Sequence, residues 1–152
     1  MLINMSLEKK IMLDLKDAML SKNQLKLEVC RSIKSAIILA KTKKGSKDIT
    51  ESIELDILQK LLKQRRESSK IYYDQKRLDL AKQEENQAKI IEHYLPEPYS
   101  LEELENLILT VMEELGVDSK KHMGRVIAEV ISRAKGRSDG KTISQLVSNK
   151  LT

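Results

Sequence analysis

The chain has 152 residues, of which 40% are hydrophobic and 34% are charged, and it contains five glycines and two prolines. This composition is typical of a helical globular protein and argues against a disordered one. Phe and Trp are absent and only four tyrosines are aromatic, which argues against a sheet platform that stacks nucleic-acid bases.

The net charge of +5 is unevenly distributed along the chain. Residues 97–118 carry seven acids and no base, whereas residues 119–152 carry eight bases and two acids. The remaining basic excess lies in residues 1–96. A basic excess at the C-terminal end favours an anionic partner there, although scattered lysines are more often simply a solvated surface.

Several classes of protein are disfavoured by what the sequence contains. Cys30 is the single cysteine, so no disulfide framework within the chain is expected. His93 and His122 have no Cys or His at ligand spacing, so we expect no metal and no cofactor. No apolar run is long enough to span a bilayer, and the first ten residues lack the apolar core of a signal peptide. We therefore expect a cytoplasmic protein that does not bind a membrane.

Apolar residues recur at helical spacing in the first 96 residues and predict four helices. The first helix is expected at about 7–20, with Ser6 as its N-cap, and the second at 24–41. The third is expected to begin after Asp48 or Thr50 and to reach residue 74, and the fourth to span 80–94. Residues 42–48 are expected to form a basic loop. The side chains expected to face the core of this part are Leu7, Ile11, Leu15, Ala18, Met19, Val29, Cys30, Ile33, Ala36, Ile37, Ala40, Ile53, Ile57, Leu58, Leu61, Leu62, Leu80, Ala88, Ile91 and Leu95.

The third and fourth helices are expected to pair as a long, polar hairpin. The apolar stripe of the third helix weakens after residue 62, and the fourth helix is poor in apolar residues. Such segments are held by charge pairs, or they protrude toward solvent or a partner. We interpret Arg65 and Arg66 with Glu84 and Glu85 as an ion network between the helices, with a second anion-binding patch as the alternative.

A domain boundary is placed at Pro96 and Pro98, which disfavour helix at the preceding residues. The predicted fold class is all-α, with an N-terminal four-helix domain at 1–96 and a C-terminal three-helix domain at 97–152. Ser100 and Glu103 have capping-box spacing and predict a helix that ends at Gly116. The residues of this helix expected to face inward are Leu101, Leu104, Leu107, Ile108, Val111, Met112 and Leu115. Two further stripes predict the last helices. Their inward residues are Met123, Val126, Ile127, Val130, Ile131 and Ala134, and then Ile143, Leu146, Val147 and Leu151.

The connection between the last two helices reads Lys135-Gly136-Arg137-Ser138-Asp139-Gly140-Lys141. Basic side chains are expected to gather around this one turn and to contact nucleic acid. These candidate binding residues are Lys120, Lys121, Arg125, Lys135, Arg137 and Lys141. The structural turn residues are expected to be Gly124, Gly136, Asp139 and Gly140, with Asp139 capping the last helix. The plain alternative is a tight turn whose bases are solvated surface.

Three elements of this region are similar to the C-terminal tail domain of the B subunit of the glutamine-dependent tRNA amidotransferases. They are Met123-Gly124-Arg125-Val126, the segment Lys135 to Gly140, and Leu146-Val147. The chain from Met5 to Thr152 resembles the YqeY-like family, which joins such a tail to a different N-terminal helical domain. The further matching elements are Lys63-Gln64-Arg65-Arg66-Glu67-Ser68, Tyr72, Arg77-Leu78-Asp79-Leu80, Glu84-Glu85 and Tyr94-Leu95-Pro96.

The resemblance implies an all-helical fold and a role with tRNA. In the amidotransferase, the tail helps to hold the tRNA while a separate kinase-like domain, which has no counterpart in this sequence, activates the acylated end. The paired acids Glu102-Glu103 and Glu113-Glu114 lie on the polar face of an amphipathic helix, and no phosphate loop or hydrolase motif is present. We therefore expect no catalytic residues and a tRNA- or RNA-binding accessory protein.

Two alternatives remain open. The first is a helical protein-interaction adapter that docks through the hairpin at residues 63–87. The second is a trans-acting component of an aminoacyl-tRNA or amidotransferase complex. Carbon–nitrogen ligase activity with glutamine as amido-nitrogen donor would then be implied by the resemblance alone.

Overall fold

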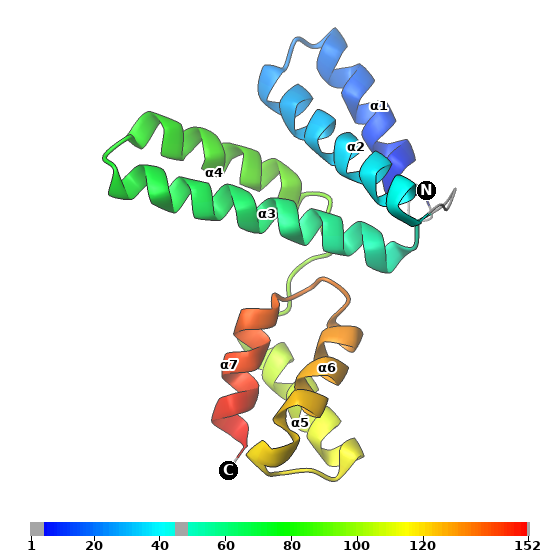
Figure 1. Ribbon diagram of the computed structural model, residues 1–152, viewed down its shortest axis with the longest axis vertical. Helices are drawn as coiled ribbons and strands as arrows, with labels where there is room; N and C mark the ends of the chain where they lie inside the picture. The colour runs from blue at the N-terminus through cyan, green and yellow to red at the C-terminus, as the bar shows by residue number, and fades with distance from the viewer. Residues whose placement is uncertain (1–4, 45–48, 152) are drawn as a thin grey trace. The chain divides into compact units, whose positions relative to one another are not determined.

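The computed structural model describes residues 5–44 and 49–151, and every regular element in these ranges is helical (Figure 1). The expected all-α fold class is confirmed. Close approaches between Cα atoms divide the chain into two compact units, Met1–Leu95 and Pro96–Thr152. The division lies one residue before the boundary placed at the prolines.

The N-terminal unit consists of two helical hairpins (Figure 1). Helices α1 (Leu7–Leu20) and α2 (Gln24–Lys44) form the first hairpin, and α3 (Glu51–Asp74) and α4 (Leu78–Glu92) form the second. Helix α2 packs against both α3 and α4. The described part of the unit therefore has the expected four helices.

Side-chain caps and left-handed turn residues fix the ends of these helices. The hydroxyls of Ser6 and Thr50 accept hydrogen bonds from backbone amides in the first turns of α1 and α3. Thr50 is thus the N-cap of α3, while Asp48 lies outside the described residues. Each hairpin turn contains a lysine with positive φ, Lys22 at 57° and Lys76 at 61°. These residues complete Schellman-type turns, a conformation that usually selects glycine.

The core of the N-terminal unit lies where α1, α2, α3 and α4 meet. Its buried residues are Leu7, Ile11, Val29, Cys30, Ile33, Ile37, Leu58 and Ile91. Two inward assignments in this unit are wrong. Met19 is 59% exposed, and Ala81 is buried whereas Leu80 is half-buried, because Ala81 lies seven positions before the buried Ala88 on the same face of α4. Helix α4 begins at Leu78, two residues earlier than expected. Helix α2 also continues to Lys44, into the segment predicted as a loop.

Polar contacts replace the missing apolar stripe between α3 and α4. Arg65 Nε donates to Gln87 Oε1 at 2.8 Å and lies 3.8 Å from a carboxylate oxygen of Glu84. The buried Ser69 hydroxyl donates to the Ala81 carbonyl at 3.1 Å. The ion pair predicted for Arg65 is confirmed, but Arg66 pairs with Glu92, about two turns further along α4 than predicted.

The C-terminal unit is a three-helix bundle. It consists of α5 (Leu101–Leu115), a short 3-10 helix η1 (Lys120–His122), α6 (Met123–Ala134) and α7 (Gly140–Lys150). The capping box of Ser100 and Glu103 is present at 3.1 Å in both directions, and Gly116 ends α5 in the left-handed conformation. The buried core consists of Leu104, Ile108, Val111, Val117, Val126, Val130, Ala134, Ile143, Val147 and Leu151. Two inward assignments are wrong here: Leu101 is 62% exposed because it opens the first turn of α5, and Ile131 is 45% exposed because it lies at the edge of the apolar stripe of α6.

The described residues include neither a membrane-spanning helix nor a cluster of metal ligands. None of the helices in residues 5–44 and 49–151 has the length and apolar character needed to cross a bilayer. Within the same residues, no group of three or more His, Cys, Asp and Glu side chains is placed to hold a metal ion.

Candidate nucleic-acid interface

The outer face of α6 carries a strip of small, exposed residues. Val126, Val130 and Ala134 are buried on the opposite side of this helix. The exposed positions Gly124, Ala128 and Ser132 recur every four residues, so they follow one another along a single face. We call Gly124, Ala128 and Ser132 the α6 strip. Its small side chains leave the helix backbone accessible to a ligand.

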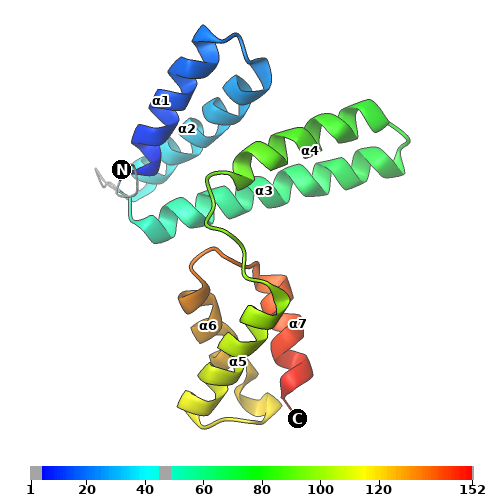
Figure 2. The same cartoon turned by 180° about the vertical axis from the view of Figure 1, so that it is seen from behind.

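Exposed cations border both ends of the α6 strip. Lys120 and Lys121 in η1 and Arg125 in the first turn of α6 lie at one end, and Lys135 and Lys141 lie at the other. Figure 2 shows that the α5–α6 and α6–α7 connections are at opposite ends of the bundle. The 12 residues of α6 span about 18 Å. The expectation that these bases gather around one turn is therefore wrong, since α6 separates them into two groups.

The Arg137 side chain contacts residues of its own unit. Its guanidinium lies 3.8 Å from the centre of the Tyr99 ring, and its Nε donates to the Glu97 carbonyl at 2.8 Å. The Tyr99 amide donates in return to the Arg137 carbonyl at 2.9 Å. Together these contacts fasten the segment before α5 to the α6–α7 turn. A phosphate would compete with them for the same guanidinium.

The four turn residues divide into two pairs. Gly136 has a φ of +80°, and Asp139 caps α7 by accepting the Thr142 amide at 2.9 Å. Gly124 and Gly140 instead lie inside the first turns of α6 and α7 without a positive φ. A Cβ at Gly124 would meet nothing within 4 Å. The assignment of Gly124 and Gly140 to turns is therefore wrong, and the fold does not require glycine at position 124.

The charges of the C-terminal unit are segregated between helices. Its acids are concentrated on and around α5. Arg133 pairs with Glu114 at 2.5 Å and with Glu129 at 2.9 Å, and Lys150 is 4.0 Å from Glu105. In the described part of this unit, the cations that border the α6 strip are in none of these ion pairs. A polyanion would therefore be attracted to the α6 side and repelled by α5.

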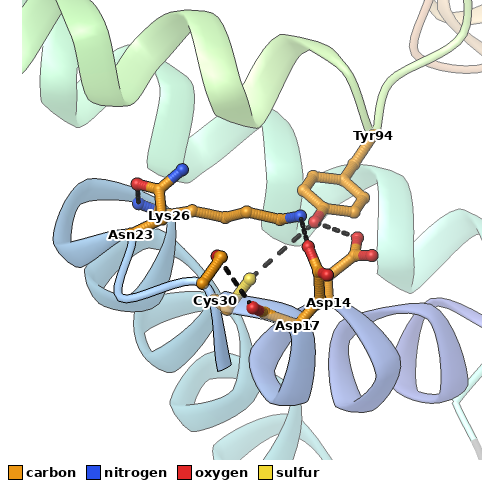
Figure 3. Close-up of polar contacts among 7 residues, drawn as sticks. Asp14, Asp17, Asn23, Lys26, Cys30 and Tyr94 are labelled. Atoms are coloured by element: carbon orange, nitrogen blue, oxygen red, sulfur yellow. Dashed lines mark hydrogen bonds and ion pairs between the residues drawn. The ribbon is translucent and has the colours of Figure 1, made fainter. Parts of the chain in front are cut away.

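A second polar cluster lies in the N-terminal unit (Figure 3). The Tyr94 hydroxyl donates to an Asp14 carboxylate oxygen and lies 3.8 Å from Cys30 Sγ. Burial, reinforced by the hydrogen bond to Asp14, raises the pKa of Tyr94, and burial also raises the pKa of the Cys30 thiol. Both groups are therefore neutral at physiological pH, and Cys30 is not activated as a nucleophile.

Sequence reasoning did not find this cluster. Asp14 and Tyr94 are 80 residues apart, and no local pattern connects them. The one available signal was Cys30 on an apolar stripe, which indicates burial and not a hydrogen-bond partner. Beside the cluster is a hollow of about 390 Å³ with Lys10, His93 and Asn23 at its edge.

Comparison with known proteins identifies relatives named "Altered inheritance of mitochondria protein 41, mitochondrial". The protein of Pyrenophora tritici-repentis is 31% identical over 144 residues, which cover 93% of this chain and 77% of the relative. That of Kluyveromyces lactis is 34% identical over 105 residues, covering 67% and 56%. That of Clavispora lusitaniae is 33% identical over 120 residues, covering 77% and 69%.

The names of these relatives overturn the expectation of a cytoplasmic protein. That expectation was based on the missing signal-peptide core and the missing apolar span. Both features argue only against secretion and against crossing a bilayer. Neither feature distinguishes one aqueous compartment from another, so the physical basis of the assignment was insufficient.

The family match extends over nearly the whole chain and includes both units. The model of the family described as "Yqey-like protein" matches residues 8–151, a range that begins in α1 and ends just after α7. The chain belongs to the Yqey-like protein family.

Proposed function

We propose that this protein is a non-catalytic accessory protein that binds tRNA or another structured RNA through the α6 strip. The observation that carries the proposal is the pair of exposed cation groups at the two ends of the strip. Arg125 and Lys135 are ten positions apart, which corresponds to about 15 Å along the helix. This face can approach a ligand closely because its central residues are small.

The chemistry of this face favours recognition of backbone shape over recognition of bases. The aromatic residue of the C-terminal unit is Tyr99, whose ring is covered by Arg137. Stacking on single-stranded bases is therefore not available at the strip. Double-helical RNA is recognised largely through its phosphates and 2′-hydroxyls. Two cation groups separated by a small-residue face suit that kind of ligand.

The proposal is tested by reversing charge at the two ends of the strip. Arg125→Glu combined with Lys135→Glu is expected to abolish retention of tRNA in a gel shift while the melting temperature changes little, because both side chains are exposed. The matched control is Lys63→Glu with Lys70→Glu on the exposed face of α3. Arg137 is unsuitable for this test because its loss would also release the Glu97–Tyr99 segment.

Salt dependence provides an independent readout. If four phosphates are neutralised, log K should fall with log salt with a slope of about −3, at about 0.7–0.9 per phosphate. The Arg125/Lys135 variant should lower this slope by about 1–2. Normal RNA binding by that variant, or loss of binding in the α3 control alone, would mean that the strip is the wrong surface.

A second candidate function, a protein-interaction adapter, is favoured by the turn between α3 and α4. Ile71, Tyr73 and Leu78 are 55%, 54% and 61% exposed around this turn, a grouping that suits a protein contact. A complex that survives nuclease and is lost in Ile71→Asp with Leu78→Asp would support the adapter. The amidotransferase alternative has only the family resemblance behind it. We expect no amide product when this chain alone is mixed with glutamine, ATP and misacylated tRNA.

A further inference from the structure

The hairpin of α1 and α2 exposes an unusual number of large apolar side chains. Six of the twelve exposed large hydrophobic residues in the described chain belong to these two helices: Met12, Leu13, Met19, Leu20, Ile38 and Leu39. Their exposure ranges from 52% for Ile38 to 77% for Leu20. Single exposed apolar residues are ordinary. Two of these six, Met12 and Ile38, line the same hollow on neighbouring helices, and such a grouping indicates a contact surface.

Part of this surface is hollowed into a groove between α1 and α2. The groove has a volume of about 340 Å³, and the buried side chains of Ile11 and Ile37 contribute to its lining together with the exposed Met12 and Ile38. Lys34, Lys41 and Glu8 also line it, and Glu8 pairs with Lys41. An open apolar groove edged by charge is the kind of surface that receives the apolar face of an amphipathic helix.

The basic excess of residues 1–96 is located on this same hairpin. Residues 5–44 carry ten bases and four acids, whereas residues 45–96 carry ten of each. The four acids are all engaged within the chain. Glu8 pairs with Lys41, Asp17 with Lys26 at 2.8 Å, Asp14 accepts from Tyr94, and Glu28 accepts from Gln24 and Gln87. The apolar groove therefore lies in a surface of uncompensated positive charge.

Helix α5 has the complementary properties. Residues 97–118 carry seven acids and no base, and the exposed face of α5 carries two leucines, Leu101 at 62% and Leu109 at 47%. The exposed Glu102 and Glu113 lie beside Leu109 on this face, since all three fall within a narrow arc of the helix. Helix α5, with 15 residues, is about 22 Å long, and α1, with 14, is about 21 Å.

We propose that the α1–α2 hairpin of one copy binds the α5 face of a second copy of this chain. Leu101 and Leu109 enter the groove lined by Met12 and Ile38. The acids of α5 face Lys34, which lines the groove, and the exposed Lys16, which lies one turn along α1 from Met12 on the same side of the helix. The contact joins two different surfaces, so it is heterologous. It leaves the α6 strip free, because α5 and the strip belong to different faces of the C-terminal bundle.

The experiment uses charge reversal on the full chain, with self-association measured by sedimentation equilibrium from micromolar to millimolar protein. The wild-type mass should rise with concentration and fall with added salt. The hairpin variant is Lys16→Glu with Lys34→Glu, and the α5 variant is Glu102→Lys with Glu113→Lys. Each variant alone should have a dissociation constant raised at least about tenfold, because like charges then face each other.

Mixing the two variants gives the decisive result. The negative hairpin of the first variant now matches the positive α5 of the second, and the wild-type surfaces match in the reverse direction. The mixture should therefore associate although neither variant does so alone. Lys63→Glu with Lys70→Glu on α3 serves as the control and should associate like the wild type. Circular dichroism of each variant confirms that the helices are intact.

The proposal is overturned by a wild-type protein that remains monomeric over the whole range. It is also overturned if association survives both reversals, or if the mixture fails to restore it. Sedimentation with vesicles containing an anionic phospholipid distinguishes the other occupant. A monomer that binds such vesicles through the hairpin, and loses binding in the Lys16/Lys34 variant, would assign this surface to a membrane instead of a second copy.

Discussion

The hydrogen bond from Tyr94 to Asp14 provides the sharpest stability test of the fold. Tyr94 follows α4 and Asp14 lies in α1 (Figure 3), so this bond joins the two hairpins of the N-terminal unit. Both side chains are half-buried. Tyr94→Phe removes only the hydroxyl and leaves the Asp14 carboxylate without this donor. The ring can keep its packing, so the effect isolates the polar contact.

The expected loss follows from the charge on the acceptor. A hydrogen bond to a charged group contributes about 1.5–3 kcal/mol, and partial exposure of Asp14 favours the lower end, about 1.5–2 kcal/mol. In a chain of this size, each kcal/mol lowers the melting temperature by about 2–4 °C. Tyr94→Phe should therefore melt about 3–8 °C below the wild type. Tyr73→Phe is the control, because Tyr73 is 54% exposed and should melt like the wild type.

The same bond makes a prediction about alkaline pH. Burial and the Asp14 hydrogen bond raise the pKa of Tyr94 above its usual value of 10.0. A group whose pKa is raised in the folded state contributes its full stability below the unfolded pKa and loses it as pH rises toward the folded pKa. Above about pH 10 the unfolded chain releases this proton first, so the free energy of unfolding should fall by about 1.4 kcal/mol per pH unit from this group.

Urea unfolding followed by circular dichroism from pH 7 to pH 11 measures both effects. Tyr94→Phe should be less stable at pH 7 and should show a shallower loss above pH 10. Burial also raises the pKa of the Cys30 thiol, and the contact with the Tyr94 hydroxyl opposes that shift. The thiol therefore adds to the alkaline loss in both proteins, and Cys30→Ser in both backgrounds removes its contribution from the comparison. Equal stability of wild type and Tyr94→Phe at pH 7, with parallel alkaline slopes, would refute this account of how the hairpins are joined.

Four further substitutions test the C-terminal unit and the turn between α3 and α4. Ile108→Ala should lower the free energy of unfolding by about 2–5 kcal/mol because Ile108 is fully buried, whereas Leu109→Ala at 47% exposure should cost under about 1 kcal/mol. Ser100→Ala removes the cap of α5 and should cost about 1 kcal/mol, measured in urea. Lys76→Gly relieves a φ of 61° and should stabilise the chain by about 0.5 kcal/mol, seen as a higher melting temperature.

The parts of the fold that were predicted correctly are those that short-range sequence determines. The Ser100–Glu103 capping box and the stripe of Val126, Val130 and Ala134 involve residues three or four positions apart, and helical geometry alone places them together. The left-handed lysines at positions 22 and 76 were missed because the turn geometry usually selects glycine. At both positions the packing of the two helices of a hairpin imposes a positive φ, and the lysine adopts this conformation although glycine would do so at lower cost.

The errors in burial have a tertiary cause. Met19 satisfies the helical period of α1, yet it is 59% exposed because the surface of α1 covered by other helices is narrower than its apolar surface. The sequence therefore showed that α1 has more apolar surface than its own core requires. It did not show whether a further helix, a second copy or solvent lies against the excess. That surplus is the physical origin of the surface proposed to receive α5.

The candidate RNA-binding residues show why a count of charges does not define a site. The sequence places seven cations within 22 positions, from Lys120 to Lys141, but α6 is a rigid spacer that separates Lys121 from Lys135. Arg137 belongs to the same basic segment but differs from these lysines in role, because its guanidinium already contacts Tyr99 and Glu97. A variant that removes Arg137 would therefore change the fold and the charge together. Arg125 and Lys135, at the two ends of the α6 strip, are exposed. Substituting them changes the surface charge and leaves the packing of the bundle intact, so an effect on RNA binding can be separated from an effect on folding.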